Sequence, residues 1–239
     1  MTEKLSTEAV FADIEANYAH IEQTLAAAAA ASGRKREDVR FMAVTKTVQP
    51  VFINHALSLG IGLIGENKVQ ELLEKKEYLT GSYEAHLIGH LQTNKVKKIL
   101  NEVSMIESVD SLRLAEEISR QTATAGKAMD ILLEVNIGSE ESKTGILPQE
   151  LPALAGQIAA LPGVQVRGLM AVPPVADTEK ERRAWFAAVR EQYESLRQSP
   201  GLNAMDVLSM GMSADYGEAV AEGATLVRVG SALFGSRRY

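Results

Sequence analysis

The chain has 239 residues, of which 46% are hydrophobic, so it can bury a large core and is not expected to be disordered. Its formal net charge of -6 argues against a general affinity for nucleic acid or for an anionic membrane, since both need a basic surface. Cysteine is absent, which excludes disulfides, thiolate nucleophiles and cysteine-based metal sites. No apolar run reaches the ~20 residues of a membrane span, and the first residues lack a signal-peptide core, so we expect a soluble cytoplasmic protein.

Residues 7–31 are predicted to form a long helix. One apolar stripe recurs there every three or four residues and consists of Val10, Ile14, Tyr18, Ile21 and Leu25. Ser6 or Thr7 can cap its start, and Ser32-Gly33 can end it. Because this helix precedes the first predicted strand, we expect it to pack outside the structure that follows.

From residue 39 onward, short apolar runs alternate with helical patterns. The predicted strands lie at 39–45, 61–65, 85–89, 104–108, 129–136, 164–171, 206–210 and 225–229. The predicted helices lie near 50–59, 67–79, 92–101, 111–125, 149–160, 177–198 and 216–222, and a short last turn begins near 231. This alternation indicates a parallel sheet, and eight strands are the number that closes a (β/α)8 TIM barrel, typically about 250 residues long. We therefore predict a single barrel domain over 1–239; a doubly wound open sheet is the alternative.

The first predicted strand ends in a lysine. Phe41-Met42-Ala43-Val44 reads as a fully buried strand, and Thr45-Lys46-Thr47 follows where that strand leaves the sheet. A lysine held half out of water can become a Schiff-base amine, because desolvation disfavours the ammonium form. A solvated lysine that opens a loop is the ordinary alternative.

The last two predicted strands end in similar loops. Leu208-Ser209-Met210-Gly211-Met212-Ser213 and Val227-Arg228-Val229-Gly230-Ser231 each join a strand to a helix start through glycine and serine. Active sites of this type of barrel lie at the C-terminal strand ends, and phosphate commonly binds the loops after the last two strands. Glycine permits close approach of the backbone, serine adds a hydroxyl, and a helix start offers N–H groups. Strand one neighbours strand eight in a closed barrel, so Lys46 is expected beside these loops.

Arg228 lies between two valines of the last predicted strand. By strand alternation, its side chain points to the opposite face from Val227 and Val229. Two interpretations stay open: an arginine that reaches solvent at an edge, or one that projects into the site.

Three other features of the sequence bear on possible binding sites. Gly60-Ile61-Gly62-Leu63-Ile64-Gly65 matches a dinucleotide fingerprint, but it follows a helix and is itself the strand, so a nucleotide site is not predicted. His90 is expected to be a loop residue lining the site rather than a metal ligand, and no metal site is predicted. Glu134 and Asn136 share one face of their strand, and either a structural hydrogen-bond network or catalysis fits them.

Several motifs together carry a resemblance. They are Ala43-Val44-Thr45-Lys46, Gly65-Glu66-Asn67, His86-Leu87-Ile88-Gly89-His90-Leu91-Gln92-Thr93-Asn94-Lys95, Glu134-Val135-Asn136, Lys143-Thr144-Gly145, Arg167-Gly168-Leu169-Met170, Leu208-Ser209-Met210-Gly211-Met212-Ser213 and Val227-Arg228-Val229-Gly230. From about residue 39 onward, the chain resembles the pyridoxal 5′-phosphate homeostasis protein family. The resemblance implies a barrel like the N-terminal domain of alanine racemase, and an intracellular role in keeping pyridoxal phosphate in balance.

The resemblance also implies specific residue roles. Pyridoxal phosphate would be carried on Lys46 as an internal aldimine, with Arg228 near its pyridine nitrogen. An arginine there donates a hydrogen bond and keeps that nitrogen unprotonated, which disfavours transaminase-type carbanion chemistry. The cofactor-binding residues implied by the resemblance are Lys46, Asn67, Met210, Ser213, Arg228, Gly230 and Ser231; Asn67 and Met210 would lie near the ring, and the last serines and glycine near the phosphate.

Catalysis is not expected from this set, and no catalytic residue is predicted. Related racemases add a β-rich second domain and a tyrosine base from a partner subunit, whereas this chain stops at Tyr239. A base opposite Lys46 is therefore not visible, and a monomeric carrier or buffer of pyridoxal phosphate is the first hypothesis. The alternatives are a pyridoxal-phosphate-dependent amino-acid racemase or decarboxylase of narrow specificity and, ranked last, a cofactor-free sugar-phosphate aldolase or isomerase.

Overall fold

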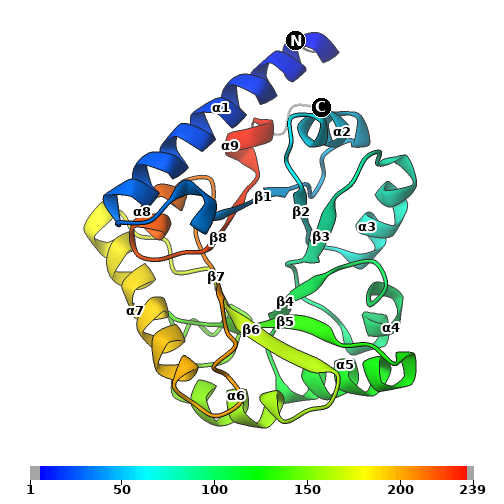
Figure 1. Ribbon diagram of the computed structural model, residues 1–239, viewed down its shortest axis with the longest axis vertical. Coiled ribbons are helices and arrows are strands. Elements are labelled where there is room, and N and C mark those ends of the chain that lie inside the picture. Colours follow the sequence, from blue (N-terminus) through cyan, green and yellow to red (C-terminus); the bar gives the residue numbers. More distant parts are fainter. Residues whose placement is uncertain (1–5, 236–239) are drawn as a thin grey trace.

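Eight parallel strands close into a barrel, as predicted (Figure 1). The computed structural model describes residues 6–235. The strands are β1 Arg40–Val44, β2 Leu63–Glu66, β3 Glu84–Leu87, β4 Met105–Val109, β5 Met129–Val135, β6 Val164–Ala171, β7 Val207–Ser209 and β8 Leu226–Val229. Each strand pairs with the next in sequence, and β8 pairs with β1, where Met42 lies opposite Arg228. This last pairing excludes the open-sheet alternative.

Helices follow the strands around the outside of the barrel. They are α2 Pro50–Ser58, α3 Val69–Lys75, α4 Val96–Ile99, α5 Leu112–Ala125, α6 Leu151–Ala159, α7 Glu179–Arg197, α8 Tyr216–Ala221 and α9 Ser231–Phe234. Local signals set several of their ends: Ser111 caps α5, Thr178 and Glu181 form a capping box on α7, and left-handed Gly126 ends α5. The helix predicted over 92–101 is shorter than expected, because 310 turn Thr93–Lys95 precedes the single turn of α4.

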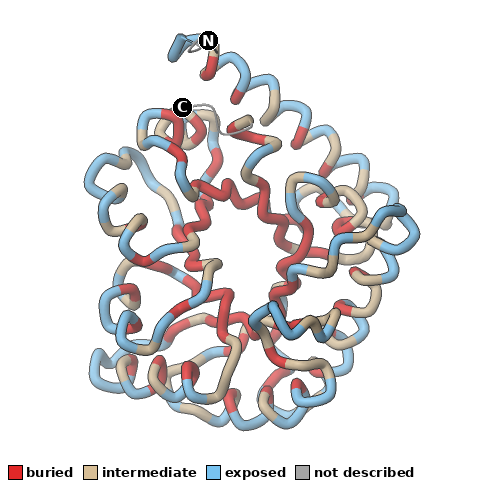
Figure 2. The backbone as a smooth tube through the Cα atoms, turned by 180° about the vertical axis from the view of Figure 1, so that it is seen from behind, coloured by how far each residue is buried: buried red, intermediate tan, exposed pale blue. Residues whose placement is uncertain are grey.

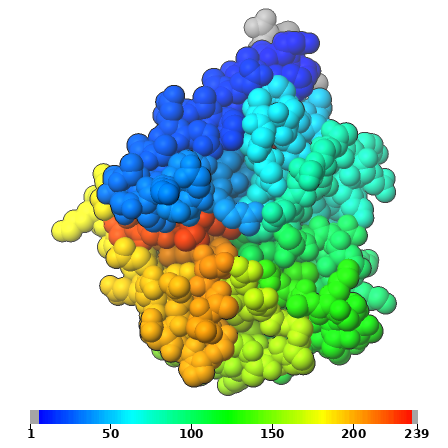
Figure 3. All heavy atoms as spheres, in the orientation of Figure 1, coloured from blue at the N-terminus to red at the C-terminus, as the bar shows by residue number. Residues whose placement is uncertain are grey.

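The N-terminal helix α1, Thr7–Ala31, packs outside the barrel wall as predicted. Ser6 caps it, since its hydroxyl accepts the N–H of Ala9 at 3.2 Å. Its buried stripe, which includes Ile14, Ile21 and Leu25, faces α8, α9 and α2, and Figure 3 shows the helix along the outer flank of the molecule. The single-domain organisation of 1–239 stays a prediction, because residues 1–5 and 236–239, with Tyr239, lie outside the described residues.

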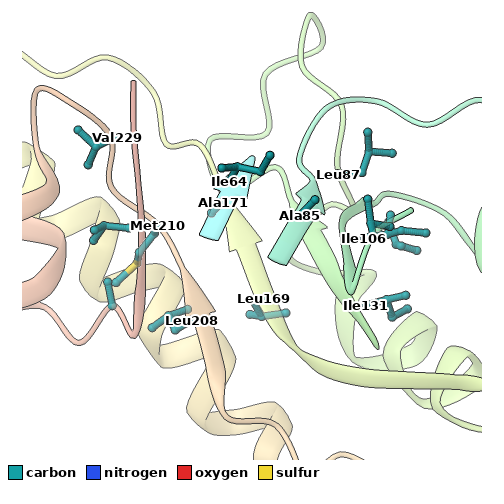
Figure 4. Packing of buried hydrophobic residues seen from close by; sticks show 14 of the residues in the cluster. Ile64, Ala85, Leu87, Ile106, Ile131, Leu169, Ala171, Leu208, Met210 and Val229 are labelled. Atoms are coloured by element: carbon teal, nitrogen blue, oxygen red, sulfur yellow. The ribbon is translucent and has the colours of Figure 1, made fainter. Parts of the chain in front are cut away.

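The core has an outer and an inner part. Alternate strand residues face the helices and join one large cluster with them, which Figure 4 shows around Ile64, Leu87, Ile106 and Leu169. The other strand residues point into the barrel and form two small apolar clusters, one of Met42, Leu63 and Leu226 and one of Met105, Leu132 and Met170. In Figure 2 the strands accordingly form a buried ring at the centre, surrounded by helices with exposed outer faces. Within residues 6–235, no helix is long and apolar enough to cross a bilayer.

Candidate functional site

A cavity of about 490 Å³ lies at the C-terminal ends of the strands. It is lined by Val44, Lys46, Thr47, Val48, Asn67, Ile88, Met170, Val172, Met212, Ser213, Ala214, Arg228, Gly230, Ser231, Phe234 and Gly235. Six of the seven residues predicted from the sequence, all except Met210, are in this set. Ends of strands far apart in sequence thus meet at one mouth, as the barrel topology requires.

Lys46 lies two residues after the end of β1. Its side chain is half-buried and lines the cavity. Among the described residues, no hydrogen-bond or ion-pair partner of its amine is found. An amine without a protein partner at the mouth of a cavity is available to a ligand.

Ser213 joins the two predicted phosphate loops. Its Oγ accepts the backbone N–H of Gly230 at 3.2 Å and that of Ala232 at 3.1 Å, so the loop after β7 is tied to the start of α9. Its hydroxyl proton is not used in these two bonds and can be donated to a ligand. A Cβ at Gly230 would lie 3.4 Å from Val44, which is an ordinary van der Waals contact, so this position has room for a side chain.

The rest of the loop after β7 is shaped by two local features. Gly211 has a φ of +90°, and a Cβ there would lie 2.5 Å from the Cβ of Ala219 in α8. The carboxylate of Asp215 accepts the N–H of Met212 at 2.7 Å, and burial raises the pKa of this carboxyl group despite that bond. Asp215 therefore has a structural contact within the loop.

Arg228 projects into the barrel, which settles the two interpretations left open by the sequence. Its side chain is buried, and its guanidinium donates to Ser209 Oγ at 2.6 Å and to the carbonyl of Ala171 at 2.9 Å. Burial pushes the pKa of Arg228 below its usual value, and the nearby carboxylates, led by Glu107, oppose that shift. A fixed cation thus forms part of the cavity floor.

A hydrogen-bonded chain continues from Arg228 down the barrel axis. Ser209 Oγ donates to Glu107 Oε2 at 2.6 Å, and Glu107 Oε1 lies 2.7 Å from His86 Nδ1. All of these side chains are buried. Sequence reasoning missed Glu107 and Ser209 because the two are 102 positions apart and meet only across the barrel. The available signal was a carboxylate, Glu107, within a largely apolar buried strand.

Asn67 follows β2 and lines the cavity. Its Oδ1 is buried and has no partner among the described residues. Gly89 lies against the Asn67 backbone, since a Cβ at 89 would be 2.3 Å from the carbonyl oxygen of Asn67. The Ile-Gly-His motif therefore has a steric reason: only glycine lets the β3 loop pass so close to Asn67.

The side chain of Met210 is not part of the cavity. It packs beside Leu208 in the outer buried cluster (Figure 4). Strand alternation explains this placement, because inward-pointing Ser209 turns its neighbour outward. Met212, two positions later, lines the cavity instead.

His90, Glu134 and Asn136 are not among the residues that line the cavity, so the expectation that His90 lines the site is wrong. His90 is 56% exposed and pairs with Asp110 at 3.2 Å. Asn136 bonds with the backbone of Glu140, and Glu134 accepts the hydroxyl of Thr144 at 2.7 Å. Glu134 and Asn136 thus hold the loop after β5, which is the structural interpretation of that pair.

Comparisons with known proteins show the family of this chain. The family described as "Alanine racemase, N-terminal domain" matches residues 14–238. The pyridoxal phosphate homeostasis protein of Aquifex aeolicus is 41% identical over 87% of this chain and 91% of its own, and that of Pseudomonas aeruginosa is 38% identical over 95% and 96%. The chain belongs to the pyridoxal phosphate homeostasis protein family.

Solved structures extend the family comparison. A protein from Bifidobacterium adolescentis, described as unknown, superposes with a TM-score of 0.90 at 36% identity, covering 97% of this chain and 98% of that one. PipY of Synechococcus elongatus, solved with PLP bound, gives a TM-score of 0.77 at 38% identity and covers 83% and 93%. Alanine racemase of Corynebacterium glutamicum, at 18% identity and a TM-score of 0.71 over 91% of this chain and 61% of that one, shares the fold.

Proposed function

We propose that this chain binds pyridoxal phosphate in the cavity at Lys46 and serves as a cytoplasmic, monomeric carrier in the homeostasis of that cofactor. The observation that carries the proposal is the half-buried Lys46 amine, which lines the cavity and has no partner within residues 6–235. Membership of the family supports the identity of the ligand, as does the PLP-bound structure of PipY.

The residues present fit this cofactor. Asn67 Oδ1 is a buried acceptor without a partner in the described chain, and such an atom is costly unless a ligand or water satisfies it. Arg228 supplies a buried donor from the floor, and Ser213, Gly230 and Ser231 supply hydroxyl and backbone groups at one side. The cavity therefore offers separate partners for an aldehyde, a ring and a phosphate.

Each of these residues has a distinct task. Lys46 would hold the aldehyde end of the cofactor through its amine, which lines the cavity. Ser213 and Ser231 would hold the phosphate, and the guanidinium of Arg228 would serve as a hydrogen-bond donor to the ring. Pyridoxal phosphate supplies an electron-withdrawing ring when bound.

The lining favours a carrier over a racemase. Among the described lining residues, Lys46 and Arg228 are the only ionisable side chains, and a guanidinium does not act as a base near neutral pH. Two-base racemisation needs a second proton acceptor on the opposite face of the substrate. The described cavity offers one amine, which suits reversible storage of an aldehyde.

The test is an absorbance spectrum of the purified protein loaded with pyridoxal phosphate, before and after borohydride, followed by peptide mapping. We expect a visible band that borohydride removes and a modified Lys46 peptide. Lys46→Ala is expected to lose the band, whereas Lys68→Ala, a matched exposed lysine beside Asn67, is expected to keep it. A Lys46→Ala protein that kept the band would contradict the proposal.

A second measurement separates carrier from enzyme. Amino acids are added one by one in deuterium oxide, and α-hydrogen exchange is followed by NMR. We expect no exchange above that of free pyridoxal phosphate. Exchange that Lys46→Ala abolishes would replace the carrier with a racemase or decarboxylase, and a sedimentation mass of two chains would contradict the monomer.

A further inference from the structure

Three charged side chains form an ion cluster behind Lys46, on the side of β2 and α3. Lys75, the last residue of α3, places its Nζ 2.8 Å from Glu66 Oε1 and 2.6 Å from Glu71 Oε1. The side chains of Glu66 and Lys75 are 1% and 11% exposed, so the cluster is largely desolvated. None of the three lines the Lys46 cavity.

The cluster holds the backbone on both sides of Lys46. On one side, Lys75 Nζ donates to the carbonyl of Thr45 at 2.7 Å, and Thr45 Oγ1 donates to Glu66 Oε1 at 2.7 Å. On the other side, the N–H of Thr47 donates to Glu71 Oε1. The two neighbours of Lys46 in the chain, Thr45 and Thr47, are therefore both hydrogen-bonded to this ion cluster.

Thr47 has a backbone conformation that needs such support. Its φ is +62°, in the left-handed region that a β-branched residue rarely adopts. A strained conformation of this kind persists only where surrounding contacts determine it. The bond from Thr47 to Glu71 is such a contact, and it lies directly after the lysine that faces the cavity.

The same cluster is coupled to Asn67. Glu66 is the last residue of β2 and immediately precedes Asn67, a residue that lines the cavity. Burial raises the pKa of Glu66, although the hydrogen bonds from Lys75 and Thr45 oppose the shift. A buried ion cluster is a poor source of net stability, since desolvation offsets the attraction, and its best-attested use is to specify one geometry.

We propose that Glu66, Glu71 and Lys75 are positioning residues that fix the backbone on either side of Lys46 and so present its amine to the aldehyde of the ligand. This inference rests on the proposed function at Lys46. It assigns to α3 a role in the covalent step and none in phosphate binding, because Ser213 and Ser231 belong to other loops.

The test compares the rate of Schiff-base formation with the affinity for phosphate. Apoprotein is mixed with pyridoxal phosphate and, separately, with pyridoxal, and the visible band is followed in time; inorganic phosphate is then used as a competitor. Lys75→Met is expected to slow band formation about tenfold with both aldehydes, because misplacement of a reacting group lowers its effective concentration. The competition constant of phosphate is expected to stay within about twofold.

Matched variants make the result specific. Lys75→Arg keeps the charge and several donors and is expected to recover most of the rate. Lys76→Met removes the next lysine, whose pair with Glu102 at 2.8 Å lies on the surface, and is expected to match the wild type. Should Lys75→Met fail to fold, Glu71→Gln serves instead, with a loss of rate in the same direction of about threefold, since one charge-assisted bond becomes neutral.

The outcomes separate the two proposals. A wild-type protein without a borohydride-stable adduct at Lys46 would defeat the proposed function. A wild-type adduct together with unchanged rates in Lys75→Met, or in Glu71→Gln where that variant is used, would overturn the positioning role alone. Equal losses of rate and phosphate affinity would also overturn it, because they indicate general disruption of the site.

Discussion

The two ends of the barrel enclose cavities of similar size, but the charged side chains are paired with one another at one end and not at the other. The upper cavity, at Lys46, measures about 490 Å³, and a lower cavity at the N-terminal strand ends measures about 470 Å³. Charged side chains of the lower cavity pair with one another: Arg40 lies 3.1 Å from Glu84, and Arg167 binds Asp130 at 2.8 Å and also Asp206. The upper cavity is lined by Lys46, whose amine has no partner in the described chain, and by Asn67, whose buried Oδ1 also has none.

This difference shows that volume alone does not identify a binding site. A paired charge has already exchanged water for a protein partner, whereas an unpaired group keeps its bonding capacity for a ligand. The buried chain from His86 through Glu107 and Ser209 to Arg228 connects the two ends, because His86 lines the lower cavity and Arg228 the upper one. We call the paired side chains of the lower cavity (Arg40, Glu84, Asp130, Arg167 and Asp206) the lower ring. The central chain and the lower ring should therefore respond differently to mutation.

The largest effect is expected from Glu107→Ala. This change leaves Arg228 and His86 buried without their shared carboxylate, and breaking a buried pair typically costs about 3–5 kcal/mol of unfolding free energy. Glu84→Ala in the lower ring breaks a half-exposed pair and is expected to cost at most about 1 kcal/mol. Urea denaturation of both variants measures the contrast, and equal losses would remove the distinction between the centre and the lower end.

A smaller effect, on ligand affinity, is expected from Ser213→Ala. It leaves the N–H groups of Gly230 and Ala232 without their acceptor and removes a hydroxyl from the cavity. We expect the dissociation constant for pyridoxal phosphate to rise about tenfold, which corresponds to roughly 1.4 kcal/mol. Ser104→Ala makes the same change beside the lower cavity, and titration of the apoprotein should show no change in affinity. An effect of both variants would contradict the assignment of the ligand to the upper end.

The sequence predicted the parts of the molecule that depend on local pattern and on topology. Eight strands separated by helices were sufficient to place Lys46 beside Ser213 and Ser231, because closure brings the first and last strands together. Strand alternation also indicated that Arg228 points away from its valine neighbours, and the structure shows that this direction is the barrel interior. These features need only the period of the strands and their order.

Side-chain contacts across the barrel or behind a strand could not be predicted from the sequence. The hydrogen bond between Glu107 and Ser209 depends on the register of several strands. In β4 that register shifts between Ile106 and Val109, and no local sequence pattern indicates this shift. Lys75 reaches the carbonyl of Thr45 from a helix whose packing angle the sequence does not fix. The outward placement of Met210, by contrast, could have been predicted from the sequence. The strand alternation that was applied to Arg228 also places Met210 on the outer face of its strand.

Removal of an arginine side chain from the lower ring is expected to lower the free energy of unfolding only slightly. Arg167→Ala removes the pairs with Asp130 and Asp206, and the latter side chain is 57% exposed. Exposed pairs are screened by water and salt, so we expect a loss of about 1 kcal/mol that shrinks in high salt. Urea denaturation at two salt concentrations measures it, and affinity for pyridoxal phosphate serves as the control. A loss comparable with that of Glu107→Ala would show that the lower ring supports the barrel as much as the central chain does.

The smallest effect concerns pH and returns to the upper end, at Glu134. Burial raises the pKa of this carboxyl group above its ordinary value of 4.5, while the hydrogen bond from Thr144 opposes the shift. The folded state thus holds the proton more tightly than the unfolded state, so this group makes the free energy of unfolding fall as the pH rises from 4.5 through the folded-state pKa. Glu134→Gln keeps an acceptor for Thr144 and has no titration, and its stability should fall less over that interval. Denaturation of both proteins at a series of pH values tests this expectation. Parallel curves would show that water reaches Glu134 as freely as it reaches the carboxylates of the lower ring, and the contrast between the two ends would then rest on Lys46 and Asn67 alone.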